Sequence, residues 1–133
     1  MKKNPVRLVL VAIIIAAGAI CGCSKALTPV SEIHIDGMPL DSRSEILSKL
    51  NTPIENDATV QVPGRQESII VNVFPTDENG KVKPGASPEV IMARDTDFFK
   101  LDNTMSKKEL ASGNYLMNIV FGGKTERVAF VVK

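Results

Sequence analysis

The chain has 133 residues, and its 16 basic and 15 acidic side chains give a formal net charge of +1 at pH 7. Three of the basic residues precede the first apolar run, so the rest of the chain carries a net charge of about −2, which excludes the basic surface of a nucleic-acid-binding protein. Both cysteines lie before residue 24, which excludes disulfides, cysteine nucleophiles and cysteine metal sites in the remaining residues. With no tryptophan and one tyrosine, a single domain of this size needs a core of mainly Ile, Val, Leu and Met.

The N-terminal segment has the layout of a secretory signal peptide, which is a basic start followed by a short apolar stretch. Met1–Arg7 contains no acidic residue, and Leu8–Ile20 contains no polar side chain. A membrane-spanning helix needs about 20 apolar residues, so a permanent transmembrane anchor is the weaker interpretation.

The end of this segment, Ile20–Cys23, resembles the lipobox of bacterial lipoproteins, in which an aliphatic residue and two small residues precede an acylated cysteine. Cys23 fits the acylated position, whereas acylation at Cys21 would place the bulky Ile20 where a small residue is required. Ser24 would favour the outer membrane if the bacterium is Gram-negative. A secreted protein without a lipid is the alternative. The resemblance implies a lipoprotein signal peptide at 1–22, a lipidated tether at 23–30 and a mature domain at 31–133.

The mature domain begins with a predicted strand followed by a predicted helix. Residues 31–37 alternate between apolar and polar side chains, which predicts a half-buried strand that ends in a turn at Gly37. Residues 41–50 predict a short helix, because Ser42 and Glu45 have the spacing of a capping box. Three apolar side chains would share one face of that helix: Ile46, Leu47 and Leu50.

The middle of the domain predicts short strands separated by turns. The turn at 76–81 and the loop at 83–88 are rich in Asp, Asn, Gly and Pro. The expected strands are 58–62 and 67–74, separated by Pro63-Gly64, and 90–93 and 98–101, linked by the charged residues 94–97.

The C-terminal residues predict a β-hairpin in which strands at 114–121 and 124–132 flank Gly122-Gly123, a strong two-residue turn signal. If the residues next to the turn pair with each other, the apolar side chains of both strands fall on one face, as a hairpin requires. In this register Tyr115 faces Phe130, Met117 faces Val128 and Ile119 faces Glu126.

About seven short strands with frequent turns predict an all-β fold, specifically an antiparallel immunoglobulin-like β-sandwich with one short helix. Four segments, in chain order, resemble the transthyretin-like, carboxypeptidase-regulatory-like domains of small bacterial lipoproteins. They are Ile35–Leu40 (the "D-G-K-P-L" opening), Val71–Thr76 (the following strand), Thr96–Leu101 ("T-D-x-x-F-x-L") and Leu110–Val120 ("L-x-x-G-x-Y-x-V-x-V"). The resemblance implies a non-catalytic module and brings no catalytic residues.

Acidic residues near turns are the candidates for metal or acid–base chemistry. Asp77 and Asn79 precede a glycine, but the spacing of a calcium-binding EF-hand is absent and a type I turn explains them. Asp95 and Asp97 would share one side of a strand, where the neighbouring basic residues favour a solvated edge. His34 is the only histidine and falls on the polar face of its strand. We therefore expect no bound metal and no cofactor.

Four residues of the C-terminal half have structural interpretations. Tyr115 lies at the start of a late strand, where a tyrosine corner predicts that its hydroxyl bonds to the backbone of residues 110–113. Three glycines are expected to have backbone roles: Gly113 at the start of a strand, and Gly122 and Gly123 in the hairpin turn.

The sequence therefore predicts a lipoprotein of the cell envelope, anchored to the bilayer through acylated Cys23, that binds or supports a protein or glycan partner and is not an enzyme. One alternative is a metal-dependent binder or degenerate hydrolase that uses the acidic loop residues. A second alternative is a structural subunit of an envelope assembly, docked through residues 41–50.

Overall fold

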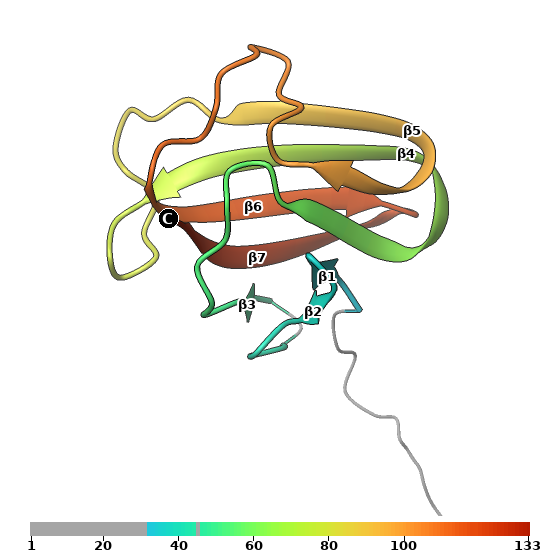
Figure 1. The fold of residues 1–133 in the computed structure, drawn as a ribbon, viewed down its shortest axis with the longest axis horizontal. Helices are drawn as coiled ribbons and strands as arrows, with labels where there is room; N and C mark the ends of the chain where they lie inside the picture. The colour runs from blue at the N-terminus through green and yellow to red at the C-terminus, as the bar shows by residue number, and fades with distance from the viewer. Residues whose placement is uncertain (1–31, 45) are drawn as a thin grey trace, which may run out of the picture.

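The computed structural model describes residues 32–44 and 46–133, and the described part is all-β, without a helix. Seven strands form one curled sheet (Figure 1). The expectations of an all-β fold and of about seven strands are confirmed. The strands are β1 (His34–Ile35), β2 (Met38–Pro39), β3 (Ser48–Lys49), β4 (Thr59–Thr76), β5 (Glu89–Lys100), β6 (Gly113–Phe121) and β7 (Lys124–Val132).

The sheet has the order β2-β1-β4-β6-β7-β3, and β5 pairs with the other edge of β4. All strand pairs are antiparallel except β3 with β7, and the isolated bridge between Ile54 and Val132 is parallel too, so the expectation of a purely antiparallel arrangement is wrong along this edge of β7. Ser42, which follows β2, forms a bridge with Lys49 of β3. The two ends of the sheet path therefore meet, and the sheet curls around its own core.

Strand β4 is one strand where the sequence predicts two. Its register with β5 shifts between Gln61 and Gln66, and Gly64 inside the shift has a φ of +78°. Pro63 also lies in the shifted segment, where no ladder hydrogen bond needs the amide proton that proline lacks. Strand β5 is likewise continuous through its charged centre, where Asp95 has a φ of +53°. The predicted interruptions are thus irregularities within long strands.

The predicted helix at 41–50 is wrong. Within this segment β3 runs parallel to β7, and the Leu50 amide donates a hydrogen bond of 3.0 Å to the carbonyl of Ala129. Leu50 is buried, but Ile46 and Leu47 are exposed, so the three residues do not share a buried face. A helix of two or three turns is marginal without support. Hydrogen bonds to β7 and burial of Leu50 favour the extended chain.

The core lies inside the curl and is built from alternate residues of the long strands. The hairpin register predicted from the sequence is confirmed, with Tyr115 opposite Phe130 and Met117 opposite Val128. As predicted, aliphatic side chains dominate. The largest fully buried side chains include Phe130, Ile33, Ile35, Leu50, Ile69, Ile91, Leu101, Met117 and Ile119.

Candidate functional site

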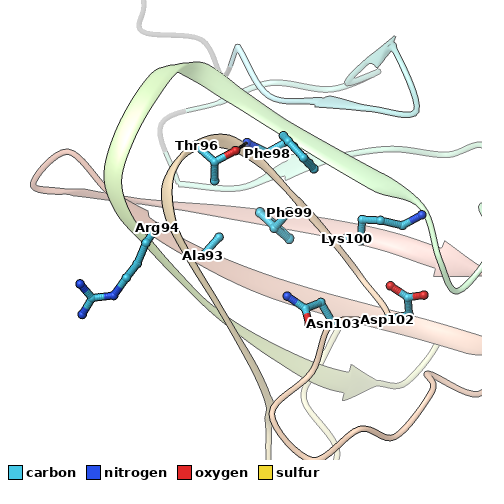
Figure 2. A pocket seen from close by; sticks show the side chains of 8 residues that line it. All are labelled: Ala93, Arg94, Thr96, Phe98, Phe99, Lys100, Asp102 and Asn103. Atoms are coloured by element: carbon cyan, nitrogen blue, oxygen red, sulfur yellow. Dashed lines mark hydrogen bonds between the residues drawn. The ribbon is translucent and has the colours of Figure 1, made fainter.

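A groove of about 570 Å³ follows strand β5 (Figure 2). Residues from both faces of the strand contribute to it, so the groove runs along the edge of β5. Phe99 and Ala93 belong to the core side, and the polar and exposed side is formed by Arg94, Thr96, Phe98, Lys100, Asp102 and Asn103.

The edge of β5 that borders the groove is open over most of its length. β5 pairs with β4 on one side. On the other side, the described residues contact it at both ends. At one end the Met105 amide donates a 2.7 Å hydrogen bond to the Val90 carbonyl and Ile91 bridges to Thr104, and at the other end the Asn103 amide donates a 3.0 Å hydrogen bond to the Lys100 carbonyl. Between these points the strand presents backbone amide and carbonyl groups to which another extended chain can bond.

Two adjacent phenylalanines point to opposite sides of β5. Phe99 is buried in the core, whereas Phe98 is 47% exposed. Because side chains alternate along a strand, only one of two neighbouring aromatic residues can face the core. The Phe98-Phe99 pair was therefore a signal for an exposed aromatic residue, and the sequence interpretation missed it.

The charges around the groove come from Arg94 and Lys100 on β5 and from Asp102 after it. The carboxylate of Asp97 is directed to β4, where it accepts a hydrogen bond of 3.1 Å from the Gln61 side-chain amide. An exposed aromatic ring, two cations and a row of backbone groups suit the binding of a partner.

The acidic candidates predicted from the sequence are not brought together. Asp77 follows one end of β4, whereas Asp95 and Asp97 lie beside the other half of that strand. Asp77 Oδ1 accepts hydrogen bonds from the amides of Asn79, at 2.8 Å, and Lys81, at 2.9 Å, so the turn uses this carboxylate. Across the described ranges, no three His, Cys, Asp or Glu residues are grouped so that they could hold a metal ion.

His34 lies on the partly exposed face of β1, as its alternating strand predicts. Its Nδ1 is 3.1 Å from the backbone carbonyl oxygen of Glu32, to which the ring N–H can donate. The ring borders a second hollow together with Arg43 and Gln61. This placement gives His34 a local hydrogen-bonding role.

Tyr115 occupies the start of β6, and its hydroxyl donates a hydrogen bond of 2.7 Å to the carbonyl of Ala111. This acceptor lies in the segment 110–113, where the sequence places it. Burial raises the pKa of the Tyr115 hydroxyl above its ordinary value, and the carboxylate of Glu89 raises it further. Gly122 and Gly123 have φ values of +57° and +76°, the backbone that a two-residue hairpin turn requires. Gly113 has a φ of +151° where β6 begins.

The predicted signal peptide, Cys23 and the tether lie outside the described residues. Within residues 32–44 and 46–133 there is no helix that is long and apolar enough to cross a membrane. Comparisons of the chain with models of protein families, with curated proteins and with solved structures give no match.

Proposed function

We propose that this chain is a lipid-anchored module of the bacterial cell envelope that binds a partner and catalyses no reaction. The observation that carries the binding part is the groove on the open edge of β5, with Phe98 exposed beside it. Of the two partner classes expected from the sequence, a protein or a glycan, the open strand edge favours a protein.

The partner would bind as an added strand. An extended peptide that pairs with a sheet edge gains backbone hydrogen bonds, and its alternate side chains reach the neighbouring surface. Phe98 offers an apolar contact to one such side chain, while Arg94 and Lys100 offer contacts to acidic ones. The proposal needs neither a metal nor an activated nucleophile.

The lipobox at Ile20–Cys23 supports the anchor. The chain between Cys23 and Glu32 can span at most roughly 30 Å when extended, so the domain would stay close to the bilayer. The outer membrane is the proposed location if the bacterium is Gram-negative, because Ser24 follows the acylated cysteine.

We further propose that the curled sheet is a divergent form of the transthyretin-like, immunoglobulin-like sandwich. The order of the four sequence segments and the Tyr115–Ala111 hydrogen bond before a late strand support this relationship. The single curled sheet in place of two packed sheets and the parallel β3–β7 pair are the departures from that fold.

The anchor is tested by Cys23→Ala in the full chain, with Cys21→Ala as the matched control. We expect Cys23→Ala to abolish labelling by a fatty acid and to release the protein from membranes or block its processing. Cys21→Ala should be processed nearly normally, because that residue leaves with the signal peptide. Unchanged labelling and membrane binding of Cys23→Ala would show that the anchor is assigned wrongly.

The groove is tested by Phe98→Ser, with Met105→Ser as the control because Met105 is more exposed but does not line the groove. Chemical crosslinking in intact cells should yield a partner adduct for the wild type and for Met105→Ser. Phe98→Ser should reduce that adduct about tenfold, the equivalent of losing about 1.4 kcal/mol of apolar contact. Equal adduct yields in all three proteins would exclude the groove as the binding site.

A further inference from the structure

Three exposed apolar side chains line up across three adjacent strands of the sheet. Met92 on β5 lies directly opposite Ile70 on β4, and Ile70 lies directly opposite Val120 on β6. Their exposed fractions are 44%, 38% and 37%. Figure 1 shows β4–β7 side by side, and alternation along the strands places this row on the face turned away from the core.

The next row on this face contains a polar atom without a partner. It runs through Asn72 on β4 and Asn118 on β6 to Arg127 on β7. The Asn118 Oδ1 atom is buried and accepts no hydrogen bond from any residue that the structure describes. Such an acceptor is normally satisfied in a folded protein, and because solvent does not reach this atom, a partner could supply the donor only after the Asn118 side chain turns outward.

The charges on this face are all positive. Arg94 lies opposite Ser68 on one side of the apolar row, and Arg127 lies on the other side. In the described part of the chain neither arginine forms an ion pair. The outward rows from Ser68–Arg94 to Asn118–Arg127 carry no acidic residue, so a second copy of this chain that docked through the same face would bring further arginines and no carboxylate to neutralise them. The complementary surface must supply its own acidic groups.

We propose that this Ile70 face, defined by Met92, Ile70, Val120, Asn118, Arg94 and Arg127, docks a protein whose contact surface is apolar at its centre and acidic at its margin. An apolar centre that excludes water, surrounded by charge pairs that fix orientation, is the usual anatomy of such an interface. The proposal goes beyond the proposed function, because the Ile70 face shares only Arg94 with the groove along β5.

The test uses the full chain in its own cells, with the photoreactive residue p-benzoylphenylalanine at Ile70, at Val120 or, as a control, at Met105. We expect the same protein adduct from positions 70 and 120 and none from position 105. Arg127→Glu should lower the yield about tenfold, and Arg127→Lys should keep it within about twofold, because the lysine preserves the charge. Arg127 does not line the groove, so this result is independent of partner binding at Phe98.

Thr125→Glu is a second variant, and it leaves Arg127 intact. Thr125 lies opposite Val120 at the end of the apolar row, so the substitution places a negative charge beside the docking surface. It should also lower the adduct yield, with thermal unfolding unchanged from the wild type. Four results would overturn the proposal: no adduct from positions 70 and 120, an adduct with the mass of two copies of this chain, an adduct with lipid alone, or a protein adduct that Arg127→Glu and Thr125→Glu leave undiminished. Phe98→Ser should leave the Val120 adduct undiminished, which would support the Ile70 face as a surface separate from the groove along β5.

Discussion

The ring of Tyr115 stacks on the ring of Phe130 across the β6–β7 hairpin, with centroids 5.7 Å apart and ring planes inclined by 20°. The hydroxyl of the same tyrosine bonds to the Ala111 carbonyl in the preceding loop. One side chain thus joins the core, the hairpin and the loop that leads into it. The two parts of this arrangement can be removed separately.

We expect Tyr115→Ala to cost about 3–5 kcal/mol of the free energy of unfolding, because it removes a buried ring and leaves a cavity beside Phe130. Tyr115→Phe should cost only about 1 kcal/mol, because it removes one hydrogen bond and the exposed Ala111 can bind water instead. Urea unfolding of residues 24–133 measures both values. Equal and negligible losses would show that Tyr115 does not pack in the core.

Stability should fall at high pH through Tyr115. The pKa of the Tyr115 hydroxyl is higher in the folded chain than in the unfolded chain. As the pH rises, the unfolded chain therefore loses the hydroxyl proton first, at about pH 10. The contribution of Tyr115 to the free energy of unfolding is complete below the pKa of the hydroxyl in the unfolded chain. It is lost as the pH rises through the pKa of the hydroxyl in the folded chain. Tyr115→Phe should therefore lose less stability than the wild type between about pH 9 and 11. Since Tyr115 is the only tyrosine and tryptophan is absent, ultraviolet titration reads its pKa directly. An ordinary pKa in that titration would contradict the prediction.

The hairpin turn depends on the backbone of Gly123. No atom lies within 4 Å of the position where a side chain would begin, so substitution there strains only the backbone, at its φ of +76°. Gly123→Ala should cost about 1–2 kcal/mol. Gly123→Asn is the control and should cost less, since asparagine tolerates this conformation. Identical unfolding curves for both variants and the wild type would contradict the prediction that the hairpin turn depends on the backbone conformation of Gly123.

We expect the domain to fold without metal, and calcium, zinc or chelator to leave its thermal unfolding unchanged. Asp77 Oδ1 already accepts two backbone hydrogen bonds, so Asp77→Ala should cost about 1 kcal/mol whether or not metal is present. A rise of several degrees with calcium that Asp77→Ala or Asp97→Ala abolishes would favour the metal-dependent alternative. Hydrolysis of a glycoside, ester or peptide substrate, lost on one carboxylate substitution, would refute the non-enzymatic proposal.

The local features of the fold could be predicted from the sequence. The register of the C-terminal hairpin follows from a two-residue glycine turn and from apolar side chains that alternate in both strands. The turn at Asp77 follows from short-range hydrogen bonds of its own side chain. In each case the residues that determine the structure are close in sequence, so the local sequence pattern is enough to predict the backbone geometry.

Only the tertiary structure decided the course of the chain where distant segments compete with local preference. Residues 41–50 have the pattern of a helix, but pairing with β7 makes residues 48–49 a strand. In the sequence, Pro63 and Asp95 look like interruptions between strands. In the structure they are irregularities within the long strands β4 and β5, because the residues before and after them keep the β4–β5 pairing. Hydrogen bonds with partners far away in sequence leave no local periodicity that could reveal them.

The surfaces also depended on the tertiary structure. Ile70, Met92 and Val120 come from three segments that look half-buried in isolation, and only the sheet register aligns them on one exposed face. The sequence by itself determined the class of fold, the closing hairpin and the candidate lipid anchor at Cys23. Which apolar residues stay in water was decided by strand pairing over long range, because a strand's two faces are equivalent until a core covers one of them.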